Sequence, residues 1–285
     1  MIPAKFDYVR PSSVDEAVRA LASGGDDAKA IAGGQSLLTL LRLRLSYPER
    51  LVDLGGLADL RGVRDAGDAL EIGALTTHYE LTRDPLIRRH CGLLAEAAAM
   101  IADPAVRHRG TLGGALAHGD PAGDLPAVIT ALDATLVARG PSGSRAITPA
   151  DFFADYLTTT LAPGEILASV RVPKLDGWGY RYEKFHLTAQ AWAIVGVAAV
   201  ARRANGHVAE ARVGLTNMGS VPVRARAAEA AASGAEASAA ALAAAAAQAD
   251  EGTSPPSDLR AAADYRRHLA RVLTGRALAA AAGVS

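Results

Sequence analysis

The sequence predicts a mixed α+β fold in two domains, and three patterns support this prediction. In the first 175 residues, short apolar runs typical of strands alternate with segments typical of helices. The stretch 173–179 then interrupts local order with one proline and two glycines. Beyond it, three strand-like runs precede alanine-rich helical sequence. We therefore expect a first domain over 1–175 and a smaller domain over 176–285, which holds a three-stranded antiparallel sheet and helices.

Capping and breaking residues predict the ends of elements in the first domain. Ser13 and, three residues later, Glu16 form a capping-box pattern at the start of the first helix. Pro48 closes the region that follows the second helix. The apolar periods predict helices over 13–22, 36–44, 93–101 and 124–132, and strands over 28–32, 51–54, 70–74, 134–138 and 166–172.

The second domain has a different pattern. Three runs, 180–185, 193–203 and 208–216, predict strands, and Asn205-Gly206 between the last two is a strong hairpin signal. The alanine-rich stretch from 222 to 248 and the segment 258–282 predict helices, because alanine has the highest helix propensity. We expect these helices to cover one side of the sheet.

Composition narrows the classes of function. The chain has 285 residues, 50% of them hydrophobic, and 30 basic against 30 acidic residues give a formal net charge of zero. This balance argues against nucleic-acid binding, which rewards a basic stripe. The N-terminus has no apolar run of the signal-peptide kind, and the longest apolar stretch, 191–201, is shorter than the roughly 20 residues of a membrane span. We expect a soluble, cytoplasmic protein, and contact with the inner face of the membrane through a larger complex stays open.

The numbers and spacing of cysteine and histidine residues argue against disulfides, iron–sulfur clusters and zinc sites within this chain. Cys91 is the only cysteine, so the chain forms no internal disulfide and lacks the roughly four thiolates of an iron–sulfur cluster. The seven histidines are ten or more residues apart, so no zinc-binding pair is present. We expect no metal site and no catalytic nucleophile, and Cys91 is interpreted as a buried structural residue.

Two glycine pairs are the strongest local signals. Gly33-Gly34 follows a predicted strand and precedes Gln35 and Ser36, and Gly113-Gly114 follows Thr111. Glycine allows positive φ and close approach of a ligand to the backbone, so N–H groups there can converge on an anion. Each pair alone is also explained by an ordinary tight turn. Together they suggest a clamp on a diphosphate, without a GxGxxG or GxxxxGK motif.

Several polar residues near the second pair admit two interpretations. His118 and Asp120 are either acid–base groups or, as we favour, hydrogen-bonding partners of a cofactor or of their own loop. Arg107 and Arg109 either face phosphate or form a solvated charge run. His78 is interpreted as a loop hydrogen-bonding residue rather than a ligand.

Motifs along nearly the whole chain resemble one family. Five occur in the first domain: 32–37 (AGGQSL), 43–45 (LRL) with 52–54 (VDL), 72–74 (IGA), 111–114 (TLGG) and 118–126 (HGDPAGDLP). Three occur in the second: 182–185 (YEKF), 192–196 (WAIVG) and 213–219 (VGLTNMG). This set resembles the FAD-binding medium subunits of molybdenum hydroxylases, with the carbon monoxide dehydrogenase type as the nearest. The set is specific to the family and much less specific to one substrate.

The resemblance implies a two-part FAD-binding domain of the vanillyl-alcohol-oxidase type, also called PCMH type, followed by a small C-terminal domain. It implies that 30–37 wraps the FAD diphosphate, that 111–115 meets it from the other side, and that Asp124 holds the ribose or adenine end. Lys184 would lie beside the isoalloxazine ring, where a positive charge favours reduced flavin. The implied FAD-binding residues are Ala30, Ile31, Ala32, Gly33, Gly34, Gln35, Ser36, Leu37, Ile101, Ala102, Thr111, Gly113, Gly114, Ala115, His118, Asp120, Asp124, Ile166, Leu167 and Lys184.

Two positions depart from the family pattern. Leu112 replaces the usual isoleucine of the second glycine turn, a swap that conserves volume. Ala191 stands before Trp192 where many relatives carry an aspartate, which weakens the expectation that a carboxylate acts on the flavin from that side and leaves the expected FAD binding unaffected.

The resemblance also implies partners. A small [2Fe-2S] subunit would pass electrons from a large molybdenum-cofactor subunit to this FAD, and an external acceptor such as a quinone would receive them. The leading alternative is the same subunit in a hydroxylase for an aromatic N-heterocycle, an aldehyde or a purine. A free-standing flavin oxidase is less favoured, and a cofactor-free scaffold is disfavoured because all four glycines are intact.

Overall fold

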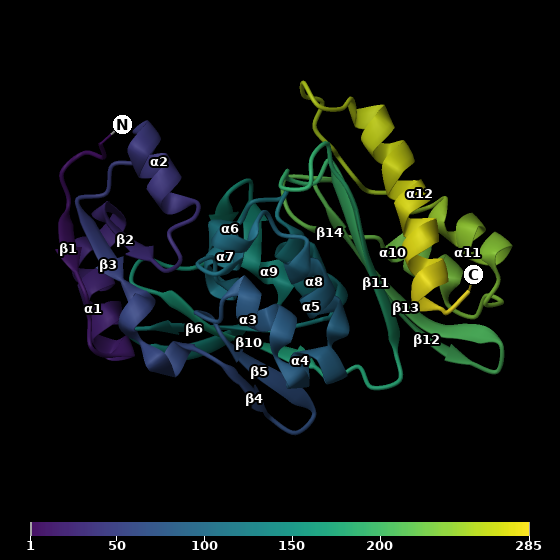
Figure 1. Cartoon of the computed structure of the whole chain (residues 1–285), viewed down its shortest axis with the longest axis horizontal. Coiled ribbons are helices and arrows are strands. Elements are labelled where there is room, and N and C mark those ends of the chain that lie inside the picture. Colours follow the sequence, from purple (N-terminus) through teal and green to yellow (C-terminus); the bar gives the residue numbers. More distant parts are fainter. Residues whose placement is uncertain (1, 285) are drawn as a thin grey trace.

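The structure is a computed structural model that describes residues 2–284. Three bodies follow one another along the long axis, in the order of the sequence (Figure 1). The first two together contain both glycine pairs, Gly33-Gly34 and Gly113-Gly114, and the third, from β11 onward, is called the C-terminal domain below. The mixed α+β fold expected from the sequence is confirmed.

The first body is a small parallel sheet with two helices. Its strands lie in the order β1 (Asp7–Val9), β3 (Arg50–Asp53) and β2 (Ala28–Ile31). Helix α1 (Val14–Gly24) begins as predicted, with the Ser13 side chain accepting a hydrogen bond from the Glu16 N–H. Helix α2 (Leu37–Leu43) follows the first glycine pair, and short 3₁₀ turns lie at Gly25–Asp27, Leu54–Gly56 and Ala58–Leu60.

The second body is a five-stranded antiparallel sheet with short helices. The sheet order is β4 (Val63–Asp65), β5 (Ala69–Gly73), β10 (Ile166–Pro173), β6 (Thr135–Gly140) and β7 (Gly143–Ile147). The helices are α3 (His78–Arg83), α4 (Pro85–His90), α5 (Gly92–Ala99), α6 (Pro104–Arg107), α7 (Leu112–His118), α8 (Asp124–Ala131) and α9 (Pro149–Phe152), and the small pair β8 (Phe153–Asp155) and β9 (Thr158–Thr159) follows α9.

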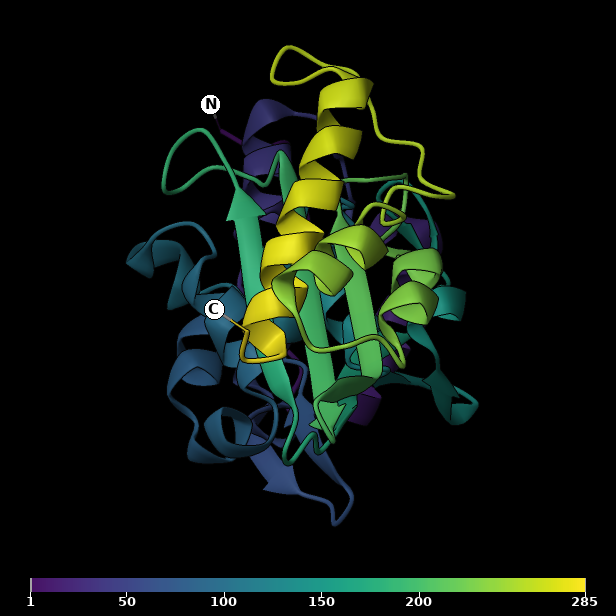
Figure 2. The ribbon, with the colours of Figure 1, turned by 90° about the vertical axis from the view of Figure 1, so that its right-hand side faces the viewer.

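The C-terminal domain is an antiparallel sheet in the order β11 (Gly179–Phe185), β12 (Val195–Ala204), β13 (His207–Thr216) and β14 (Val223–Arg224). Helices α10 (Arg226–Ala232), α11 (Ala239–Ala246) and α12 (Ala263–Ala281) cover its outer face (Figure 2). The sheet therefore has four strands rather than the predicted three, because β14 is too short to show alternation. The hairpin at Asn205-Gly206 is confirmed, and both residues have positive φ.

Helices α5 and α8 pack on the inner face of the C-terminal sheet. Strand β12 is therefore covered on both faces, which explains its uninterrupted apolar run from Val195 to Ala201. The core of the second body accordingly includes Tyr182, Ala198 and Val200 of the C-terminal sheet. This apolar cluster therefore extends across both domains, while the C-terminal domain and the first body each have a further cluster of their own.

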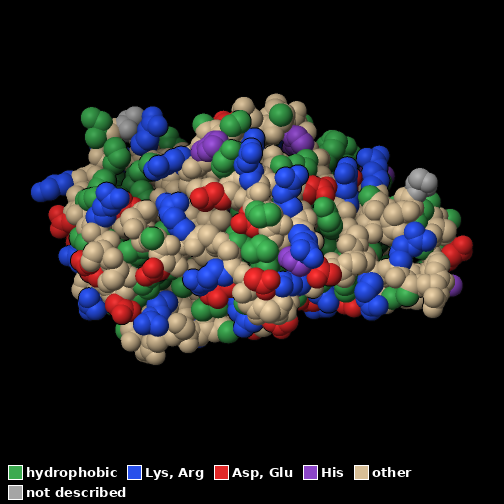
Figure 3. Space-filling view, turned by 60° about the horizontal axis from the view of Figure 1, so that its bottom comes forward, with side chains coloured by type: hydrophobic (Ala, Val, Ile, Leu, Met, Phe, Trp, Pro, Cys, Tyr) green, Lys and Arg blue, Asp and Glu red, His purple; other side chains and the backbone are tan. Residues whose placement is uncertain are grey.

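Outside this core, the surface carries mixed charges. Basic and acidic side chains are interspersed over the face in Figure 3, so the zero net charge is not a balance of two opposed patches there. Cys91 is buried, and burial together with the Asp84 carboxylate raises the pKa of its thiol to about 12, which fits a structural role.

Candidate functional site

The two glycine turns meet where the first and second bodies touch. A Cβ atom at Gly33 would lie 2.0 Å from the Arg109 carbonyl oxygen, so only glycine permits this approach. A Cβ atom at Gly114 would lie 3.9 Å from that of Ala32. The pairing of the two turns, proposed from the sequence, is therefore present in the fold.

The first turn presents unpaired backbone donors. Among residues 2–284, no protein acceptor receives a hydrogen bond from the N–H of Gly33, Gly34, Gln35 or Ser36. Gly34 has a φ of +73°, a conformation that side chains disfavour. Four consecutive N–H groups without partners form a ready site for an anion.

The second turn uses its backbone donors differently. The N–H of Leu112 donates to the Thr76 carbonyl at 2.9 Å, and that of Gly113 to the Ala74 carbonyl at 2.7 Å. The Gly114 N–H donates to Oγ1 of Thr111 at 3.1 Å, since this turn is the capped start of α7. These amides hold the turn against the end of β5, and Thr111 is the residue of this turn that lines the pocket described next.

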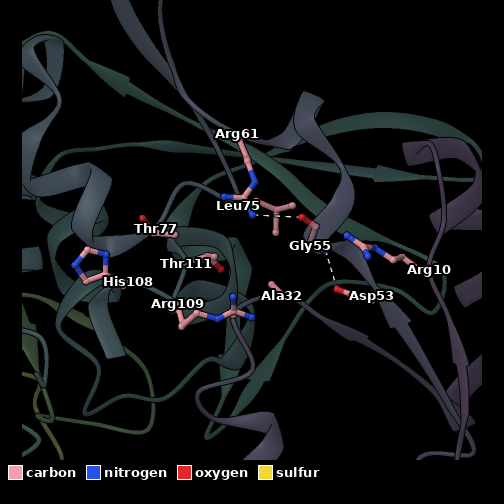
Figure 4. Close-up of a pocket in the computed structure, with 11 residues that line it drawn as sticks. Arg10, Ala32, Asp53, Gly55, Arg61, Leu75, Thr77, His108, Arg109 and Thr111 are labelled. Carbon is pink, nitrogen blue, oxygen red and sulfur yellow. Dashed lines mark hydrogen bonds between the residues drawn. The ribbon is translucent and has the colours of Figure 1, made fainter. Parts of the chain in front are cut away.

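A pocket of about 370 Å³ lies beside both turns (Figure 4). Three arginines line it, and none has a carboxylate within ion-pairing distance in the described chain. The single carboxylate, Asp53, accepts hydrogen bonds from the Tyr8 hydroxyl and from the Gly55 N–H at 2.8 Å. The pocket therefore carries net positive charge beside the free N–H groups. Its lining residues are Arg10, Ala32, Gly33, Asp53, Gly55, Arg61, Leu75, Thr77, His108, Arg109 and Thr111.

A buried polar cluster joins the two domains. The Lys184 ammonium lies 2.9 Å from Oδ2 of Asp124, and the Tyr182 hydroxyl donates to Oδ1 of Asp124 at 2.6 Å. Burial raises the pKa of Asp124, and the nearby Lys184 charge and the Tyr182 hydrogen bond act in the opposite direction. Burial also raises the pKa of Tyr182 well above its usual value, so its hydroxyl stays protonated. The structure therefore brings Asp124 and Lys184 together as partners of each other.

The remaining predicted residues fall into three groups. Ala30 and Ile31 belong to β2, and Leu37 begins α2. Ile166 and Leu167 open β10 and are buried in two apolar cores, and Ala115 packs on one of these. Asp120 accepts a hydrogen bond from the Ala122 N–H at 2.8 Å, so it supports its own loop, and His118 is the last residue of α7.

From the sequence, Arg107 and Arg109 were expected either to face a phosphate or to form a solvated charge run, and the structure places the two arginines differently. Arg109 lines the pocket, whereas Arg107 turns inward and donates to the carbonyls of Ile101 and Ala102. His78 is buried, and its Nδ1 has no partner in the described structure. Burial, with the Arg107 charge as a second cause, lowers the pKa of His78 to about 4.

Sequence reasoning did not assign a site role to Tyr182 of the buried cluster or to seven residues that line the pocket: Arg10, Asp53, Gly55, Arg61, Leu75, Thr77 and His108. The pocket residues come from segments distant in the chain, and no spacing pattern connects them. Tyr182 could have been predicted from the sequence. It lies two residues before Lys184 in the same predicted strand, so the two side chains lie on the same face of the sheet.

Residues 2–284 contain no group of histidine, cysteine and acidic side chains arranged to hold a metal ion. Within the same range, no helix has the length and apolar character needed to cross a bilayer.

Comparison with known proteins gives two family matches. The family described as "FAD binding domain in molybdopterin dehydrogenase" matches residues 4–175, and "CO dehydrogenase flavoprotein C-terminal domain" matches residues 180–281. The carbon monoxide dehydrogenase medium chain of Hydrogenophaga pseudoflava is 40% identical over 282 residues, which cover 99% of this chain and 98% of that protein.

Two further relatives extend the comparison. The 6-hydroxypseudooxynicotine dehydrogenase complex subunit alpha of Paenarthrobacter nicotinovorans is 40% identical over 99% of this chain and 96% of that protein. A solved structure of carbon monoxide dehydrogenase from Hydrogenophaga pseudoflava superimposes with a TM-score of 0.96 at 43% identity, covering 99% of this chain and 98% of that one.

Proposed function

Because the chain belongs to the family of FAD-binding medium subunits of molybdopterin dehydrogenases, we propose that it serves a carbon monoxide dehydrogenase as the electron-transfer subunit. The observation that carries the choice of enzyme is that medium chains of carbon monoxide dehydrogenase from two organisms match at 40% and 38% identity over almost the full length of both chains. The division into functional parts at 1–175 and 176–285 belongs to the same proposal.

The residues at the glycine turns fit the diphosphate of FAD. A diphosphate carries negative charge and many acceptor oxygens, and Gly33 to Ser36 offer four free N–H donors. The three unpaired arginines of the pocket supply positive charge, and the Thr111 hydroxyl supplies a further donor. Gly33 itself is required by the close approach of Arg109, so the cradle depends on tertiary packing and not only on the turn.

FAD, when bound, supplies the ability to take up electrons singly and release them as a pair. The chain's own residues bind and orient it. Gly33 to Ser36 and Thr111 would hold the diphosphate. Ile101, Ala102, Asp124 and Lys184 are the positions that the family resemblance assigns to the remainder of the cofactor. Ile166 and Leu167 are buried in apolar clusters, which exclude water from the interior at the start of β10.

The partners follow from this role. We assign the electron supply to a small [2Fe-2S] subunit and a large molybdenum-cofactor subunit, since the one cysteine of this chain is too few for a cluster. Relatives are chains of multi-subunit dehydrogenases, which supports a heteromeric complex. An external acceptor such as a quinone takes the electrons, and the complex works in the cytoplasm.

One other substrate class has specific support. The subunit from a 6-hydroxypseudooxynicotine dehydrogenase complex is as similar, at 40% identity, as the carbon monoxide dehydrogenase chain. The second candidate is therefore the same electron-transfer role in a hydroxylase of an aromatic N-heterocycle.

Purification of the tagged chain from its native host with its associated subunits tests both parts of the proposal. We expect FAD, iron and molybdenum to co-purify, and carbon monoxide to reduce an artificial acceptor. Reduction by an N-heterocycle but not by carbon monoxide would select the second candidate. Absence of FAD from the isolated chain, even after reconstitution, would overturn the proposed role itself.

A further inference from the structure

A turn that follows α5 is held by two cationic side chains. The Arg107 guanidinium donates through Nη1 to the Ile101 carbonyl at 2.8 Å and to the Ala102 carbonyl at 3.0 Å. The Lys184 ammonium donates to the Met100 carbonyl at 3.2 Å. Three consecutive carbonyl groups just beyond the C-terminal end of α5 (Gly92–Ala99) are thus each held by a cationic side chain.

The same turn has an unusual backbone. Ala102 has a φ of +42°, in the left-handed region that residues with a Cβ atom rarely adopt. Such a conformation persists only where surrounding contacts impose it, and strained residues are concentrated at binding sites. Arg107 makes contacts of this kind, because it holds the carbonyl of Ala102 itself and that of the preceding residue.

The short helix α6 positions Arg107 over the Ile101–Ala102 turn. Asp103 caps the short helix α6 by accepting a hydrogen bond from the Val106 N–H at 2.9 Å, and α6 carries Arg107 back over the turn. The charge of Arg107 also acts on the buried His78 ring next to it. Arg109, two residues later, lines the arginine pocket instead.

We propose that Arg107 is a positioning residue for FAD: it keeps the strained Ile101–Ala102 turn in the one geometry that receives the cofactor. The proposal rests on the proposed function, in which this turn lines the FAD site. In this proposal Arg107 acts through the turn, whose two carbonyl groups it holds. Lys184 fixes the adjacent carbonyl, so the turn is tied on one side to α6 and on the other to the C-terminal sheet.

The test compares Arg107→Met with a matched control, Arg203→Met. Arg203 also donates through Nη1 to two consecutive carbonyls at a helix end, those of Ala282 at 2.9 Å and Gly283 at 3.5 Å, but in the C-terminal domain. The readouts are the FAD dissociation constant of the full chain and the visible circular dichroism of bound FAD. We expect Arg107→Met to bind FAD about tenfold more weakly, with an altered spectrum. The control is expected to lower thermal stability and to leave both readouts unchanged.

A double variant adds a rescue. Ala102→Gly in the Arg107→Met background removes the cost of the left-handed conformation, so part of the lost FAD affinity is expected to return. If Arg107→Met does not fold, Arg107→Lys carries the test, because it keeps the charge but loses the planar, forked donor geometry. Wild-type affinity and an unchanged spectrum in the folded Arg107 variant would overturn the proposal. Failure of the wild-type chain to bind FAD would overturn the proposed function instead.

Discussion

The ammonium of Lys184 lies 2.9 Å from the carboxylate of Asp124, and both side chains are almost fully buried, 2% and 6% exposed, where the two domains join. Asp124 is the first residue of α8 in the first domain, and Lys184 belongs to β11 in the second. When both groups are ionised their charges cancel. The positive charge that the family resemblance assigns to Lys184 is therefore opposed within the protein, and any influence on FAD depends on the state of Asp124.

Asp124→Asn is expected to destabilise the protein by about 3–5 kcal/mol, because it leaves the Lys184 ammonium buried without a counter-charge. Urea unfolding followed by far-ultraviolet circular dichroism measures the change. Asp68→Asn is the control, since Asp68 pairs with Arg171 at 3.5 Å on the exposed surface and is worth about 0–1 kcal/mol. Equal stability of the two variants would contradict the importance of the buried pair.

Gly33→Val is expected to yield folded protein that binds FAD at least tenfold more weakly. Its side chain would collide with the Arg109 carbonyl and force the two glycine turns apart. The absorbance ratio at 450 and 280 nm reports on bound flavin. Gly275→Ala within α12 is the control, because its Cβ would lie 3.6 Å from that of Ala246, an ordinary contact. A normal flavin content in Gly33→Val would refute the placement of the diphosphate.

Arg109→Gln is expected to weaken FAD binding about tenfold at low salt, since it removes one unpaired positive charge from the pocket. The difference from wild type should shrink in about 1 M salt, where the Debye length is about 3 Å. Fluorescence titration of the apoprotein with FAD at two salt concentrations provides the measurement. Arg88→Gln, an exposed charge on α4 outside the pocket, should change neither value.

His78 is expected to make stability depend on pH. Its pKa in the folded protein is about 4, below the ordinary 6.5, so the unfolded chain binds more protons between these values. Its contribution is therefore fully present above pH 6.5 and is lost as the pH falls toward 4. The difference between these two pKa values corresponds to about 3 kcal/mol in the free energy of unfolding.

Urea unfolding at pH 7 and pH 4.5, in wild type and in His78→Gln, isolates this contribution from that of other groups. The variant should lose less stability on acidification than the wild type does. His268→Gln, on the exposed side of α12, should behave as the wild type does. A His78→Gln variant with the full acid sensitivity of the wild type would show that the burial of His78 has no such effect.

Much of the fold could be predicted because its signals are local. Ser13 caps α1 through its own hydroxyl, and Asn205-Gly206 forms its hairpin through two positive φ angles. The element ends at α5, α8, β10 and β11 lie within about two residues of those expected. Strand β14 was not predicted, because two residues are too few to show a period. Of the hairpin formed by β6 and β7, only β6 was predicted, because most residues of β7 are exposed and give no alternation of apolar and polar side chains.

The sequence by itself determined the glycine turns, the hairpin and the apolar strands, since each depends on backbone freedom or periodicity within a few residues. Only the tertiary structure decided that the N–H groups of Gly33 to Ser36 stay free, whereas two N–H groups of the second turn donate to the carbonyls of Ala74 and Thr76. It also decided that Arg109 faces a pocket and Arg107 does not. Hydrogen-bond partners and buried charge pairs join residues tens of positions apart, and the energy that selects them arises only when packing removes water from those groups.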